Sequence, residues 1–124
     1  MSKPKSPDFP ELERVFHEQR RLSIMTALFN HGGQASFSEL KSACELTDGN
    51  LKSHLRALDD EGIVTINRKF YGTGGGRPRT EVRVTKTGHK RFMQYLNLLS
   101  SVIKEAKVSE KTLKKNNANQ LKFT

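Results

Sequence analysis

A polar face on residues 48–61 carries side chains whose chemistry suits contact with base pairs. Leu51, Leu55 and Leu58 recur at helical spacing and predict the buried side of a helix. An Asn amide pairs with adenine, an Arg guanidinium with guanine and a Ser hydroxyl with bases or phosphate, while Gly lets a backbone approach closely. An ordinary amphipathic helix has the same pattern, so the neighbouring elements must decide its meaning. The polar side carries Gly49, Asn50, Lys52, Ser53 and Arg56.

A second set of candidate contacts brackets the glycine-rich stretch at residues 72–76. Residues 67–91 hold eight Lys or Arg and one Glu, a net charge of +7 out of +9 for the whole chain. This positive charge favours binding to a polyanion, because phosphates that are neutralised by cations release their counterions. A basic face kept for solubility is the alternative. Arginines on a thin loop suit a narrow minor groove, so we expect DNA contacts from Arg68, Lys69, Arg77 and Arg79.

Apolar spacing predicts a first helix that begins at Glu11 and ends at the glycines Gly32 and Gly33. Its apolar positions are Leu12, Val15, Phe16, Leu22, Met25, Leu28 and Phe29. Residues 34–36 are short enough to form only a brief extended segment.

Two further helices joined by a tight turn are predicted next. Ser36 and Glu39 have the spacing of a capping box, which begins a short helix. Thr47 is the expected N-cap of the helix at 48–61, and Gly62 is placed to end it. Helices joined this way form a helix-turn-helix unit, whose second helix enters the major groove of DNA. We include Ser36 and Thr47, at the two helix starts, among the DNA contacts.

The apolar period then changes from helix to strand. All four residues at 63–66 are β-branched, and residues 80–85 alternate between polar and apolar, so together they predict a hairpin. We expect residues 67–80 to form a wing that lies at the minor groove. Thr85 or Thr87 is expected to start a final helix.

The apolar residues of that final helix cover a face broader than one stripe, so we expect the helix to pack against its copy in a two-fold dimer. We call this expected interface the dimer seam. Packing only within the chain is the alternative. The domain organisation follows: a flexible leader at 1–8, a winged helix at 9–92, a dimerisation helix at 93–108 and a basic disordered tail at 109–124. The expected seam residues are Phe92, Tyr95, Leu96, Leu99, Val102, Ile103 and Ala106.

The stretch from Ser36 to Phe92 resembles winged-helix regulators related to the multiple-antibiotic-resistance (MarR) and arsenic-resistance (ArsR) repressor families. The resemblance covers about half the chain and implies a winged-helix fold, dimerisation and binding to operator DNA, without identifying an effector. The chain lacks the cysteine pair or clustered His and Asp of metal-sensing relatives. The matching positions are Phe37, Leu40, Leu46, Thr47, Gly49, Asn50, Leu51, His54, Leu55, Leu58, Gly62, Arg77, Pro78, Arg79, Thr80, Thr85 and Gly88.

Several other classes of protein are disfavoured. Cys44 is the single cysteine, which excludes a disulfide framework and a cysteine-based zinc site within one chain. The stretch GTGGGRP lacks the GK[ST] ending of a phosphate-binding loop. We expect no enzyme activity, no cofactor and no metal, and we expect a cytoplasmic protein, because no apolar stretch approaches the roughly 20 residues of a membrane helix. The histidines are scattered without ligand spacing: His17, His31, His54 and His89.

We therefore expect a mainly α protein with a small β-wing: a winged helix-turn-helix with an added C-terminal dimerisation helix. Its expected function is that of a sequence-specific, double-stranded-DNA-binding transcriptional regulator, a homodimeric repressor at a pseudo-palindromic operator. A winged-helix module that binds protein or RNA is the alternative, although the absence of Trp disfavours stacking on single strands. The residues do not separate repression from activation and mark no effector pocket.

Overall fold

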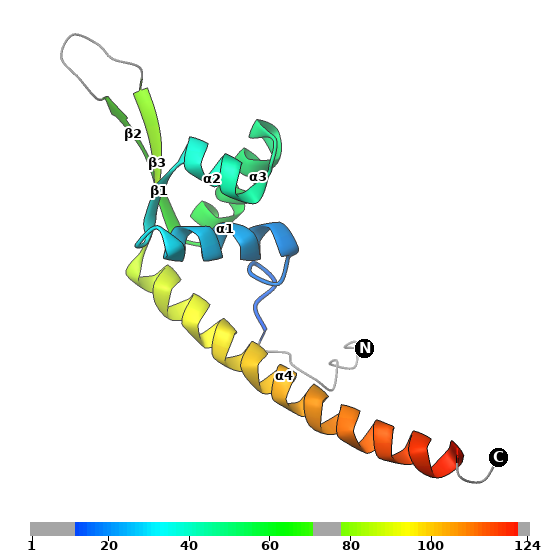
Figure 1. Cartoon of the computed structure of the whole chain (residues 1–124). Coiled ribbons are helices and arrows are strands. Elements are labelled where there is room, and N and C mark those ends of the chain that lie inside the picture. The colour runs from blue at the N-terminus through cyan, green and yellow to red at the C-terminus, as the bar shows by residue number, and fades with distance from the viewer. Residues whose placement is uncertain (1–11, 71–77, 122–124) are drawn as a thin grey trace, which may run out of the picture. The chain divides into compact units, whose positions relative to one another are not determined.

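The computed structural model describes residues 12–70 and 78–121. Figure 1 shows helices α1, α2 and α3 beside a small sheet, followed by the long helix α4. This mainly α architecture with a small antiparallel sheet confirms the expected fold class. The elements are α1 (Gln19–Asn30), β1 (Gln34–Ser36), α2 (Phe37–Cys44), α3 (Asp48–Asp60), β2 (Val64–Phe70), β3 (Pro78–Val84) and α4 (Lys86–Leu121).

Two compact units make up the chain. The first spans residues 13–93 and contains the three-stranded sheet, α1 to α3 and the first two turns of α4. The second contains α4 from residue 94 onward. The expected wing and recognition helix both belong to the first unit.

The first helix starts later than the apolar spacing predicts. Residues 14–16 form a turn, in which Phe16 N–H donates to the Glu13 carbonyl, and α1 begins only at Gln19. The Glu18 carboxylate accepts from the N–H groups of Arg20 and Arg21, so an acidic N-cap sets the helix start. The apolar spacing predicted a helix start that is too early, because a turn also buries Val15 and Phe16.

The sheet has the strand order β1-β3-β2 and is antiparallel throughout. The brief segment at 34–36 is confirmed as β1, where Ala35 pairs with Val82 of β3. On the other side of β3, Ile66 of β2 pairs with the same Val82. Gly32 and Gly33 adopt positive φ values of 77° and 92° after α1, which confirms them as the helix end.

The core of the first unit is apolar and draws on every element. Phe92, from the second turn of α4, packs against Phe16 and Phe29, with ring centroids 5.2 and 5.1 Å apart. Phe92 is therefore a core residue of the winged unit, and its assignment to the dimer seam was wrong. The buried apolar residues of this unit are Val15, Phe16, Ile24, Met25, Ala27, Leu28, Ala35, Leu40, Leu51, Leu55, Leu58, Ile63, Val64, Val82 and Phe92.

Helix α4 is longer than expected. It continues through residues 109–121, for which the sequence predicted a disordered tail. The chain contains no Gly or Pro after Gly88, and Lys, Glu, Leu and Ala are good helix formers. The pair Glu110–Lys114, 2.8 Å apart, adds the favourable i,i+4 spacing.

The remaining seam residues differ in exposure. Tyr95 is buried, Leu96, Leu99 and Val102 are half-buried, and Ile103 is 48% exposed. Ala106 is exposed as well, and Leu113, one heptad beyond it, is 58% exposed. The described part of α4 thus keeps a partly open apolar stripe.

Candidate nucleic-acid interface

The buried and the exposed residues of helix α3 lie on opposite faces, as the sequence predicted. Leu51, Leu55 and Leu58 are buried, with at most 2% of each exposed. The polar residues of the opposite face are all exposed: Gly49, Asn50, Lys52, Ser53 and Arg56.

The start of α3 is fixed by local contacts. Thr47 is the N-cap, and its hydroxyl accepts from the Asn50 N–H at 3.2 Å. Asp48 forms an ion pair with Lys41 of α2 at 2.8 Å. The hydrogen bond from Lys41 lowers the pKa of the Asp48 carboxyl below its ordinary value. The negative charge lies in the first turn, where the helix dipole also favours it.

Ser36 has a different place from the one expected. Only 4% of it is exposed, and its hydroxyl accepts from the Glu39 N–H at the start of α2. The Glu39 carboxylate accepts in return from the Ser36 N–H, which completes the predicted capping box and lowers the pKa of Glu39. Ser36 is therefore a buried N-cap of α2 and is not part of the exposed face.

The turn between α2 and α3 contains an unusual backbone. Glu45 has φ 52° and ψ 48°, a left-handed conformation that Gly adopts at lower cost. The Leu46 N–H donates back to the Lys41 carbonyl at 3.2 Å, which closes the end of α2. This turn brings α2 and α3 together within three residues, as the helix-turn-helix prediction requires.

His54 lies at the edge of the buried side of α3 and is half-buried. Its Nδ1 atom accepts from the Arg21 Nε at 3.2 Å, and Glu18 lies 3.8 Å away. Burial alone would raise the pKa of the Glu18 carboxyl, but the Arg21 N–H and His54 outweigh it and the pKa is lowered. Sequence reasoning missed Arg21, because 33 residues separate it from His54 and no motif joins them.

The cations of the hairpin lie on paired strands. Arg68, Lys69 and Arg79 are exposed, and Lys69 pairs with Arg79 in the ladder. Lys69 also lies 3.5 Å from the Glu81 carboxylate. Arg77 and the glycine-rich stretch lie outside the described residues.

A surface hollow of about 590 Å³ joins α3 to the hairpin. Lys52 and Arg56 line it from α3, and Arg68 lines it from β2. Two carboxylates, of Asp48 and Asp59, lie at the same hollow. The cations of the predicted recognition helix and wing therefore share one concave surface.

A family described as "winged helix DNA-binding domain" matches residues 20–103. The chain belongs to this family. The match spans the helix-turn-helix, the hairpin and the first part of α4, so the recognition made from the sequence is confirmed at the level of fold and family. The winged-helix chain is thus a DNA-binding domain, and the solved structures named below are described as transcriptional regulators.

Individual proteins are similar to this chain over much of its length. The winged-helix chain is 30% identical over 83 residues to the uncharacterized protein MJ0432 of Methanocaldococcus jannaschii, covering 67% of this chain and 86% of the relative. It is similar to a solved transcriptional regulator homologue from Pyrococcus horikoshii OT3, with 32% identity, a TM-score of 0.69 and coverage of 76% and 89%. An organohalide-sensing regulator, RdhR-CbdbA1625, shares the fold at 16% identity, with a TM-score of 0.65 and coverage of 94% and 72%.

The described residues contain neither a candidate metal site nor a candidate membrane-spanning helix. Within 12–70 and 78–121, no three His, Cys, Asp or Glu side chains are grouped so as to hold a metal ion. No helix in those ranges has the length and apolar character needed to cross a membrane.

Proposed function

We propose that this winged-helix chain is a homodimeric, sequence-specific repressor of transcription. In this proposal residues 48–61 lie in the major groove and the hairpin 67–80 lies at the adjacent minor groove. The operator is a pseudo-palindrome, because a two-fold dimer presents two equivalent helices.

The exposed and uncommitted polar face of α3 carries this proposal. Within the described residues, the side chains of Asn50, Ser53 and Arg56 make no hydrogen bond or ion pair. These donors and acceptors are therefore available to base edges, and no internal contact must break first. Asn and Arg offer the bidentate pairs that distinguish adenine and guanine.

The concave surface beside α3 supports a backbone contact. Lys52 and Arg68 lie at one hollow, and cations in such a position neutralise phosphates. The carboxylates of Asp48 and Asp59 limit where a phosphate can approach, which favours one register over others.

The stripe on α4 supports the dimer. Ile103 and Leu113 are large apolar side chains with about half of their surface exposed, and Ala106 lies between them at heptad spacing. A second copy of the same helix offers the complementary surface. Mass measurement by light scattering at micromolar concentration tests this, and a monomer would exclude the dimer.

Binding assays with selected DNA test the function. The chain is first used to select duplexes from a random pool, and the selected duplex, a scrambled duplex, single strand and RNA are then compared at two salt concentrations. We expect strong preference for the selected duplex. Arg56→Ala or Asn50→Ala should reduce discrimination by about 1–3 kcal/mol for each bidentate hydrogen-bond pair that the variant removes.

Lys90→Ala serves as the control, because Lys90 is an exposed cation of α4 away from the hollow. Arg68→Ala and Arg79→Ala should weaken all duplexes alike and reduce the salt dependence. Equal binding of single strand or RNA would instead favour the alternative, an interaction module for RNA. Unchanged discrimination in Arg56→Ala and Asn50→Ala would contradict the placement of α3.

A further inference from the structure

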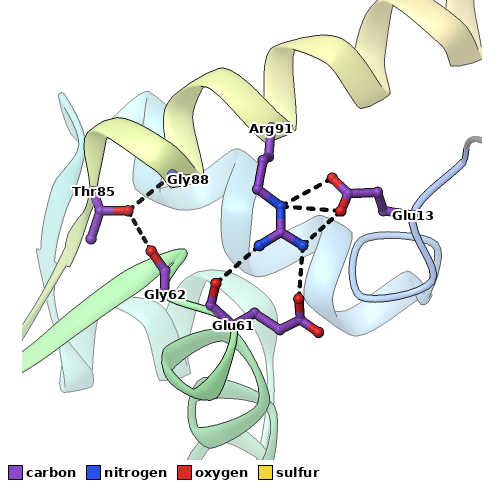
Figure 2. Close-up of polar contacts among 6 residues, drawn as sticks. All are labelled: Glu13, Glu61, Gly62, Thr85, Gly88 and Arg91. Carbon is purple, nitrogen blue, oxygen red and sulfur yellow. Dashed lines mark hydrogen bonds and ion pairs between the residues drawn. The ribbon is translucent and has the colours of Figure 1, made fainter.

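The far end of α3 meets two other segments at one polar junction. Figure 2 shows Glu61 and Gly62, which directly follow α3, beside Thr85, Gly88 and Arg91 at the start of α4 and Glu13 before α1. All of these residues belong to the unit 13–93.

Arg91 uses its whole guanidinium group at this junction. Its Nε and Nη2 atoms donate to the Glu13 carboxylate, at 3.1 and 2.6 Å. Nη1 donates to the Glu61 carbonyl at 2.9 Å, and Nη2 to the Glu61 carboxylate at 2.7 Å. The hydrogen bond to Glu13, then that to Glu61, raises the pKa of Arg91 further above its ordinary value. A Lys ammonium lacks the planar fork that this pattern requires.

Thr85 and Gly88 form a second attachment to the same segment. The Thr85 hydroxyl donates to the Gly62 carbonyl at 2.6 Å and accepts from the Gly88 N–H at 2.9 Å. The Thr85 N–H donates to the Ile63 carbonyl at 2.9 Å. A Cβ atom on Gly88 would lie 2.1 Å from that carbonyl oxygen, so only glycine permits the approach.

Two contacts with the end of α3 fix the direction of the helix, whereas a single contact would allow it to rotate. Thr85 and Arg91 are six residues apart, which is about 9 Å along a helix. Thr85 holds Gly62, and Arg91 holds the C-cap of α3, Glu61. The end of α3 therefore cannot turn about the Thr85 contact without breaking the hydrogen bonds of Arg91.

We propose that Arg91 is a positioning residue for DNA recognition: it fixes the direction of α3 against the start of α4 and thereby sets the half-site spacing that a dimer reads. This inference rests on the proposed function. In this proposal the dimer reads the direction fixed at the first turns of α4, because the proposed seam lies farther along the same helix, Lys86–Leu121. Half-site spacing follows from the separation and direction of two recognition helices.

The experiment measures affinity against spacing. The selected operator is rebuilt with its half-sites moved apart or together by single base pairs, and a duplex with one half-site is included. For the unaltered protein we expect each one-pair change to weaken binding by roughly tenfold or more, comparable to a mismatched base pair. Arg91→Met and Arg91→Lys should flatten this profile, while affinity for the single half-site stays within about threefold.

Matched variants separate positioning from general stability. Lys90→Met removes a charge from the same turn of α4 and should leave the profile sharp. Glu13→Ala removes a partner that is not attached to α3, so it should lower the melting temperature without flattening the profile. Glu61→Ala keeps the carbonyl contact and should flatten the profile in part. If the Arg91 variants do not fold, Glu61→Ala tests the positioning role in their place.

The outcomes distinguish the two proposals. A sharp spacing profile that Arg91→Met and Glu61→Ala leave unchanged would overturn the positioning role alone. A flat profile for the unaltered protein would overturn it as well. Failure of the unaltered protein to bind any duplex would overturn the proposed function, and the positioning role with it.

Discussion

The two ends of α3 differ in how they are held. At its beginning, the described contacts are an N-cap from Thr47 and an exposed ion pair between Asp48 and Lys41. At its end, Glu61 and Gly62 receive hydrogen bonds from Arg91 and Thr85, and Gly88 packs directly on the next carbonyl. One end presents polar groups to solvent, and the other uses its polar groups internally.

In the proposed function the two ends of α3 therefore have different roles: the beginning contacts DNA, and the end positions the helix. Side chains that read DNA must be free of internal partners, because every internal bond broken on binding reduces the net affinity. A helix with a free end still needs a fixed direction, which the contacts at the other end supply. Substitutions at the two ends should accordingly affect different measurements.

Gly88→Ala should give the largest loss of stability. The new Cβ would lie 2.1 Å from the Ile63 carbonyl oxygen, and backbone rather than a flexible side chain must move. We expect the free energy of unfolding to fall by about 3 kcal/mol, the upper part of the range for overpacked sites. Chemical denaturation of the full chain measures it.

Gly49→Ala, at the beginning of α3, is the matched control. No atom lies within 4 Å of the new Cβ, and Ala is the better helix former by up to about 1 kcal/mol. The chain should therefore become slightly more stable, while its affinity for the selected duplex falls because the backbone can no longer approach as closely. Similar losses of stability in both variants would remove the proposed contrast.

Thr85→Val should have an intermediate effect. The variant keeps the shape but loses the hydroxyl that caps α4 and donates to Gly62. We expect a loss of about 1–2 kcal/mol in the free energy of unfolding. Thr87→Val is the control, since Thr87 is exposed in the same turn, and it should change stability much less. A loss of the same size in Thr87→Val would indicate a propensity effect alone.

Asp48→Asn should give the smallest effect, and that effect should depend on pH. Because the folded-state pKa of Asp48 is lowered, its ion pair contributes above the ordinary value of 3.8 and is lost as the pH falls below it. The variant should melt slightly below the unaltered protein at neutral pH, and the gap should close in acid. The pair is exposed, so added salt should also shrink the gap.

Asp60→Asn removes the same charge at the opposite end of α3, where the helix dipole disfavours a carboxylate, and should not lower the melting temperature at neutral pH. Equal melting of Asp48→Asn and the unaltered protein at neutral pH would show that the Lys41 pair contributes nothing.

Local chemistry explains which parts of the site were predictable. The caps at Ser36 and Thr47 and the terminating Gly62 act within a few residues, so their spacing in the chain was sufficient. The left-handed Glu45 gave no such signal, because Glu is not a residue that favours positive φ. The unexpected helix at 109–121 shows that a polar composition alone does not exclude helix where Gly and Pro are absent.

The alternation of apolar and polar residues was enough to determine the helix-turn-helix, the hairpin and the outward face of Asn50, Ser53 and Arg56, because each depends on periodicity or on neighbours in sequence. Only the folded chain decided that Phe92 belongs to the core and that Arg91 joins Glu13 to Glu61. Those partners lie 78 and 30 residues from Arg91. Contacts over such separations depend on how all the elements pack, and no local pattern encodes them.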